Sequence, residues 1–224
     1  MNRHCVPTEA SSRVRDLLSL REVVVLANVP EGRVRKDIET GVLSKPHVIR
    51  LADARLCFGW FHVFMVAAVY SNETLTGKLR KIAIHRIGDE CLPVWSEPCR
   101  HDCNPVYDLD ANGRVELDRF VSLDLSKVLH HIRPRVGVYA SGLRRIEEKA
   151  DILGGEAVFK GSRLSVLHIG KMVESGEKAE NILEDYPNLN DDDIRFAALY
   201  YKAHPSIGRP RSGGEKHHGG SCTG

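Results

Sequence analysis

The feature that most constrains this chain is its longest apolar run, LCFGWFHVFMVAAVY, from Leu56 to Tyr70. A helix that crosses a bilayer needs about 20 apolar residues, whereas this run is shorter, contains His62 and follows Arg55. A helix that is apolar on every side is buried in a protein core. We therefore expect residues 51–70 to form a core helix, and we expect no association with a membrane.

The composition is that of a globular protein with room for two modest domains. The 224 residues are 42% hydrophobic and 28% charged, and 32 basic against 30 acidic residues give a formal charge of +2. This balance excludes a uniformly basic, histone-like protein but allows local basic patches. Met1 to Ser12 contain no signal peptide. Six scattered cysteines without an export signal indicate reduced thiols and a cytoplasmic protein.

Residues 17–50 contain the pattern of two short helices joined by a tight turn. Apolar residues recur at helical spacing from Leu17 to Ala27. Asn28-Val29-Pro30 breaks that helix, and Pro30 is suited to begin the next one, which we expect over Glu31 to Thr40, ending at Gly41. Two helices arranged in this way form a helix-turn-helix.

The middle region, residues 51–149, is predicted to be helical with one hairpin. After the core helix we expect an amphipathic helix over 74–87, a loop over 88–105, and a hairpin near 106–120 around Asn112-Gly113. A further helix begins at Asp124 and is interrupted by Pro134. Residues 136–149 form a basic, polar connector.

Residues 150–205 predict a compact module of two short strands and three helices. The strands, Ala157–Lys160 and Arg163–Ser165, flank a turn at Gly161-Ser162. The helices are expected near 166–174, 178–185 and 191–203, and the last begins with a capping box formed by Asn190 and Asp193. Residues 1–16 are expected to be a flexible leader, and residues 206–224 a Gly-rich disordered tail.

The fold class that follows is mainly α with short β-hairpins. Two helix-turn-helix-like modules, at the two ends of the chain, are joined by a helical middle segment.

The last module resembles a known family. Its sequence contains a Gly-Gly pair, a Gly-x-Arg strand, a Val at a helix start, a mid-module Gly and a Tyr-Pro-x-Leu segment; the residues are Gly154, Gly155, Gly161, Arg163, Val166, Gly176, Tyr186, Pro187 and Leu189. This pattern is similar to domain of unknown function 433, a family of VapB-like antitoxins. Residues 17–50 resemble the MerR-type helix-turn-helix, with Pro30 in place of the usual capping Ser or Thr.

These resemblances imply an antitoxin of a type II toxin–antitoxin system. Its partners would be a PIN-like ribonuclease toxin and its own operator DNA, bound as a homodimer for autoregulation. No cofactor is implied. Two alternatives stay open: a MerR-like, ligand-responsive transcriptional regulator with a pocket under residues 56–70, and a protein-interaction module that does not bind DNA.

Five basic residues are the candidate DNA contacts. On the second short helix, Arg33 and Arg35 can read guanine, and Lys36 can neutralise a phosphate. Lys45 and Arg50, in the wing-like segment that follows, can reach the neighbouring backbone. The alternative is an ordinary solvated basic helix face.

The remaining motifs favour structural explanations. We favour a structural ion pair for Arg163, with a contact to DNA or toxin as the alternative. We favour solvated helix faces over a surface that mimics nucleic acid for the acidic residues Glu177, Glu180, Glu184, Asp185 and Asp191 to Asp193. Asp108 to Gly113 resembles half a calcium loop, but Arg119 stands where the bidentate Glu belongs. Cys99, His101 and Cys103 are too closely spaced for a zinc knuckle. We therefore predict no metal site, and we predict no enzyme because no catalytic motif occurs.

Overall fold

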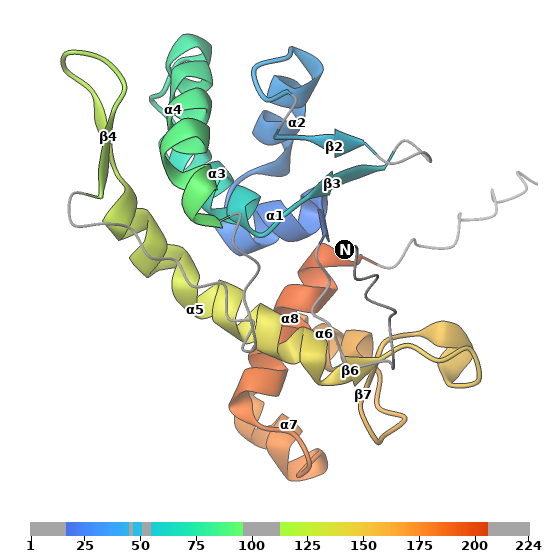
Figure 1. Cartoon of the computed structure of the whole chain (residues 1–224). Coiled ribbons are helices and arrows are strands. Elements are labelled where there is room, and N and C mark those ends of the chain that lie inside the picture. Colours follow the sequence, from blue (N-terminus) through green and yellow to red (C-terminus); the bar gives the residue numbers. More distant parts are fainter. Residues whose placement is uncertain (1–16, 45–46, 51–54, 96–112, 206–224) are drawn as a thin grey trace, which may run out of the picture.

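The computed structural model describes residues 17–44, 47–50, 55–95 and 113–205, and Figure 1 shows their arrangement. The first elements are β1 (Leu18–Ser19), α1 (Leu20–Ala27), α2 (Glu31–Glu39), β2 (Ile49–Arg50) and β3 (Leu56–Phe58). The middle elements are α3 (Phe61–Tyr70), α4 (Gly77–Trp95), β4 (Arg114–Glu116), β5 (Ser122–Asp124) and α5 (Leu125–Arg144). The last are β6 (Ile146–Glu147), a 3-10 turn (Leu153–Gly155), β7 (Val158–Phe159), α6 (Val166–Glu174), α7 (Ala179–Asp185) and α8 (Asp191–Ala203). The mainly α fold with short hairpins is thereby confirmed.

The first helix begins at Leu20 rather than Leu17 because Ser19 caps it. The Ser19 side chain accepts a hydrogen bond from the Glu22 N–H, and the Glu22 carboxylate accepts one from the Ser19 N–H, which is a complete capping box. Asn28 ends α1 in the left-handed conformation at φ 57°. Pro30 then precedes α2, which begins at Glu31 where it was expected.

The three short strands of the N-terminal half form one antiparallel sheet in the order β1-β3-β2. Leu18 pairs with Phe58, and Ile49 pairs with Cys57. In the chain order β1-α1-α2-β2-β3, the two short helices are therefore followed by a hairpin that returns to the strand preceding them (Figure 1). Residues 45–46 and 51–54 lie outside the described part of this hairpin.

Helix α3 is the centre of the larger core. All ten of its residues are buried, and α1, α4 and α5 each pack against it. The helix expected over residues 51–70 is thus shorter, because residues 56–58 join the sheet instead. Helix α4 extends to Trp95, so the loop expected from residue 88 begins later. None of the described helices is both long and apolar enough to cross a membrane.

The middle region differs from the expectation in two places. The described hairpin β4–β5 turns over residues 117–121, where Asp118 accepts hydrogen bonds from the N–H groups of Phe120 and Val121 and so forms the turn. Residues 106–112, in the earlier part of the expected hairpin, lie outside the described residues. Helix α5 continues through Pro134 to Arg144, because packing against α1, α3 and α8 offsets the lost hydrogen bond.

The C-terminal module contains its three helices close to where they were expected, but its strands pair differently. Strand β7 pairs with β6, and Ser165 forms only an isolated bridge with Val158. The module therefore begins near residue 146 rather than 150. Its α8 packs on α6, α5 and α1, and Tyr139 of α5 lies against Phe196 and Tyr200 of α8. The two end modules thus share one core through α5 (Figure 1).

Candidate nucleic-acid interface and basic cleft

Helix α2 presents one face to solvent and buries the opposite one. Val34 and Asp37 are buried, whereas Gly32, Arg35, Lys36 and Glu39 are exposed and share one face at helical spacing. We call these four residues the outer face of α2. Helix α2 has nine residues, and an isolated helix of that length is only marginally stable in water. Its position therefore depends on what its buried side contacts.

Asp37 anchors the buried side of α2. Its carboxylate accepts two hydrogen bonds from Arg80 of α4, at 2.6 and 2.9 Å, and one from the Tyr70 hydroxyl at 3.0 Å. Burial and the Asp37 carboxylate raise the pKa of Tyr70, so this hydroxyl stays a donor. The hydrogen bond with Asp37 raises the pKa of Arg80. This bidentate buried pair fixes α2 against α3 and α4.

Arg33 contributes to the same attachment. Its Nη2 donates to the backbone oxygens of Glu73 at 2.8 Å and of Leu75 at 3.2 Å, in the loop between α3 and α4. A guanidinium held by two carbonyl groups is positioned to support the helix. Arg33, one of the basic residues predicted from the sequence to contact DNA, is therefore directed toward the protein.

Arg35 and Lys36 are the predicted residues that the outer face of α2 exposes. Arg35 forms an (i, i+4) ion pair with Glu31, and the Arg35 side chain is still 55% exposed. Arg50 is paired with Leu56 through its backbone in the hairpin. Lys45 lies outside the described residues. The structure thus brings Arg35, Lys36 and the backbone of Arg50 into one short module.

A cleft of about 790 Å³ lies in the C-terminal module, and family-signature residues form much of its wall. Signature residues from two separate segments line it: Gly161, Arg163, Tyr186, Pro187 and Leu189. Three further basic residues, Arg144, Arg145 and Lys160, also line it, and Asp185 is the carboxylate of the lining. We call this the signature cleft. The other signature residues have local roles outside its lining: Gly154, Gly155 and Gly176 have positive φ, and Val166 begins α6.

A tight turn builds one side of the signature cleft. The Ser162 hydroxyl donates to the Phe159 oxygen at 2.8 Å and accepts from the Leu164 N–H at 3.1 Å. Gly161, in the same turn, has φ 74°, which glycine adopts without strain. The Lys160 N–H donates to the Arg145 oxygen at 2.8 Å, which joins this turn to the end of α5.

Arg145, and not Arg163, forms the ion pair that joins the end of α5 to the start of α8. Arg145 Nη2 lies 2.9 Å from Oδ2 of Asp193, whose side chain is 1% exposed and caps α8. Arg163 is exposed and forms no ion pair with any residue that the structure describes, so the expected structural role for it was wrong. The basic wall from Arg144, Arg145 and Lys160 was missed, although the sequence does place these cations on either side of the module's first strands.

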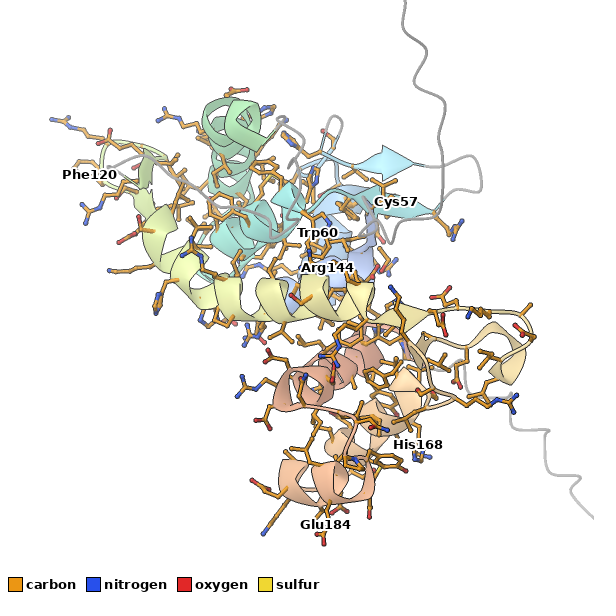
Figure 2. The ribbon with its side chains drawn as sticks, turned by 60° about the horizontal axis from the view of Figure 1, so that its bottom comes forward. Cys57, Trp60, Phe120, Arg144, His168 and Glu184 are labelled. Atoms are coloured by element: carbon orange, nitrogen blue, oxygen red, sulfur yellow. The ribbon has the colours of Figure 1, made fainter. Side chains whose placement is uncertain are left out.

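Metal and disulfide chemistry receive no support from the described residues. No group of three or more metal-ligating side chains comes together within them, and Cys99, His101, Cys103 and Asp108 lie outside them. Cys57, whose side chain is described, is a free thiol. Most of the acidic residues expected on solvated helix faces are exposed: Glu177, Glu180, Glu184, Asp185, Asp191 and Asp192. Asp193 is the exception, because it is buried where it caps α8 and pairs with Arg145. Figure 2 shows Glu184 on α7 at the opposite end of the molecule from Phe120, which marks the β4–β5 hairpin.

The chain resembles known proteins in two comparisons. Residues 146–201 match the model of a family described as "Protein of unknown function (DUF433)", which confirms that part of the predicted resemblance. An uncharacterised protein of Sinorhizobium fredii, y4eO, is 27% identical over 206 residues, covering 90% of this chain and 88% of its own. No solved structure gives a significant match. The C-terminal module is thus similar to this family of unknown function, and the similarity to the rhizobial protein extends over most of the chain.

Proposed function

We propose that this chain is a cytoplasmic DNA-binding regulator of the antitoxin type, without catalytic activity. Its N-terminal module reads operator DNA, and its C-terminal module holds a PIN-like ribonuclease toxin. The observation that carries the proposal is the outer face of α2. Two short helices joined by a turn are followed by a hairpin, and the second helix exposes Arg35 and Lys36 while its other side is fixed by Asp37.

The dimensions and charges suit a duplex. The major groove of B-DNA is about 12 Å wide and admits one α-helix. With α2 in the groove, Arg35 faces base edges and Lys36 faces a phosphate. The exposed ion pair between Arg35 and Glu31 contributes at most about 1 kcal/mol, so a guanine or a phosphate can replace Glu31 at low cost. A single helix reads a short half-site, so a homodimer on a two-fold operator follows.

The signature cleft is the proposed toxin-binding surface. Four basic residues, Arg144, Arg145, Lys160 and Arg163, line it beside one carboxylate. A nuclease with an acidic metal site has the opposite charge, and complementary charge favours fast, selective association. Arg163 contributes the largest share of the binding energy for the toxin, because it is exposed and has no partner carboxylate among the residues described here.

Retardation of the DNA upstream of the gene tests the first half of the proposal. Arg35→Ala combined with Lys36→Ala is expected to weaken binding at least about tenfold, since two charged contacts are lost. The matched control is Lys171→Ala combined with Arg195→Ala, which removes the same charge from exposed positions of the C-terminal module. The control is expected to bind like the wild type. An equal loss of DNA affinity in both double variants would show that the effect comes from net charge alone. If the wild type does not retard the upstream DNA, DNA reading is contradicted.

Co-purification with the product of the adjacent reading frame tests the second half. Deletion of residues 151–205 is unsuitable because α8 shares the core with α1 and α5, so point substitutions are needed. Arg163→Glu is expected to lose the partner, and Lys171→Glu, exposed on α6, is expected to retain it. If the wild type retards DNA but never retains a neighbouring gene product, the toxin is excluded and the ligand-responsive regulator is favoured.

A further inference from the structure

A second cleft lies where the N-terminal module, α5 and α8 meet. Its volume is about 380 Å³. Its polar lining comes from four elements and the turn after α1: Arg21 from α1, Asn28, Glu31 from α2, Arg135 from α5 and Lys202 from α8. Valines of α1 and Leu199 of α8 supply apolar surface. We call it the junction cleft. It is separate from the signature cleft, since the two have no lining residue in common.

The guanidinium of Arg135 is incompletely satisfied. Its Nη1 is buried and has no hydrogen-bond partner among the described residues. A buried donor without an acceptor is unfavourable, and more so when it belongs to a cation. Native proteins rarely keep such a group unless it serves a purpose, and a bound ligand is one such purpose. Arg135 is also one of the residues that line the junction cleft.

The other charged residues make the junction cleft cationic. Arg21 Nε donates to the Lys202 backbone oxygen at 3.1 Å, which joins α1 to α8, and leaves much of its guanidinium exposed. The Lys202 ammonium is also exposed, 3.4 Å from Glu174 outside the cleft lining. Glu31 is the carboxylate of the lining, and it already accepts from Arg21 and Arg35. Three cations therefore face one carboxylate that is shared between two arginines.

We propose that the junction cleft binds a small anion, a carboxylate or phosphate compound, through Arg135, Arg21 and Lys202. Its volume is at the lower end of the range for small-molecule sites, about 300–1,000 Å³. Arginine presents a planar set of donors that suits both carboxylate and phosphate groups. A nucleic acid strand does not suit this site, because a cleft of about 380 Å³ accommodates a small molecule and not a continuous polynucleotide backbone.

Occupancy of the cleft has a consequence for α2 that rests on the proposed function. Glu31 is the first residue of α2 and is shared by Arg21 and Arg35. An anion that engages Arg21 removes one of these partners, and Glu31 is then held by Arg35 alone. Arg35 becomes slightly less available to DNA, and because the exposed pair is weak the ligand is expected to lower operator affinity by no more than about fivefold.

The binding test uses the full chain without DNA, so its outcome does not depend on the proposed function. Thermal melting is followed in chloride buffer at constant ionic strength with phosphate, pyrophosphate, succinate or citrate. We expect a saturable rise in Tm either with the two phosphate compounds or with the two carboxylate compounds. The comparison of these two pairs shows which class of anion the cleft binds. If none of the four probes raises the Tm of the wild type beyond chloride at equal ionic strength, the proposal is overturned.

Variants locate the site. Arg135→Met keeps the length of the side chain and removes the guanidinium, so we expect it to abolish the ligand-dependent rise while the unliganded protein melts at the same or a higher temperature. Lys202→Met, on the exposed side, is expected to weaken binding about tenfold. Lys171→Met, at an exposed position of α6 that lines neither cleft, is the matched control and is expected to respond as the wild type does. Arg163→Met reports whether the anion binds in the signature cleft instead. A response retained in both Arg135→Met and Lys202→Met, or lost only in Arg163→Met, contradicts the proposal.

Discussion

The pair formed by Asp37 and Arg80 offers the sharpest test of how α2 is held in place. The two side chains are 4% and 12% exposed and share two hydrogen bonds. Removing one partner of a buried ion pair costs about 3–5 kcal/mol, because the other charge is left uncompensated. We therefore expect Arg80→Ala to destabilise the fold by about that amount, since within the described part of the chain the Asp37 carboxylate then keeps only the Tyr70 hydroxyl.

In a protein of this size each kcal/mol corresponds to about 2–4 °C in Tm, so Arg80→Ala should lower the Tm by about 6–20 °C in thermal melts followed by far-UV circular dichroism. Asp37→Ala should have a similar effect. The double variant should be little worse than either single one, because the uncompensated charge is gone. Arg80→Lys, which keeps the charge but not the bidentate geometry, should fall between the wild type and Arg80→Ala. Additive losses in the double variant would refute the proposed coupling.

Three further predictions concern packing, protonation and the junction of the modules. Gly170→Ala should destabilise the fold by about 1–3 kcal/mol, because the added Cβ would lie 2.4 Å from a backbone oxygen of α8. Gly32→Ala, which has open space around it, should stabilise the fold slightly. Equal effects of the two substitutions in urea denaturation would contradict this prediction. Burial lowers the pKa of His62 to about 4, so the unfolded chain takes up a proton first as pH falls. Stability should decline between about pH 6.5 and 4, by on the order of 3 kcal/mol, and a pH series of melts in which His62→Gln declines as steeply would contradict the assignment. Tyr139→Phe removes a 2.8 Å hydrogen bond to the buried Glu22 carboxylate and should cost about 1.5–3 kcal/mol; a Tm equal to that of the wild type would contradict it.

The helices of the C-terminal module were predictable because their ends are encoded locally. Ser165 caps α6, and Asn190 and Asp193 form the capping box of α8. Gly176 then follows α6 with φ 89°. The box formed by Ser19 and Glu22 belongs to the same class of signal and could have placed the start of α1. Local signals of this kind determine helix ends with few long-range contacts.

The two-residue strands and the continuous α5 could not be predicted in this way. Strand β1 exists because Leu18 pairs with Phe58, forty residues away. Helix α5 passes through Pro134 because helices from both end modules pack along it. In both cases tertiary contacts determine the structure, and these contacts outweigh the intrinsic helix and strand propensities of the residues.

At the candidate site, too, the identity of the residues was predictable from the sequence, whereas the direction in which their side chains point was not. The sequence correctly placed basic residues on α2, but a helical pattern cannot distinguish a guanidinium that faces solvent from one that faces carbonyl groups. Arg33 is held by the Glu73 and Leu75 oxygens, while Arg35 is exposed. Likewise, the signature residues were identified, but the charge of their cleft was not, because Arg144 reaches it from the end of α5. Figure 2 shows Arg144 on that part of the helix.

The most direct test of the central claim is the salt dependence of operator binding by the full chain. Affinity for DNA upstream of the gene is measured by fluorescence anisotropy from about 50 to 200 mM salt, where counterion release makes the logarithm of the affinity fall linearly. We expect a steep decline for the wild type, and a slope smaller in magnitude by about 1–2 for Arg35→Ala combined with Lys36→Ala. The absence of binding by the folded wild type, or identical slopes for the two proteins, would contradict DNA reading by the outer face of α2.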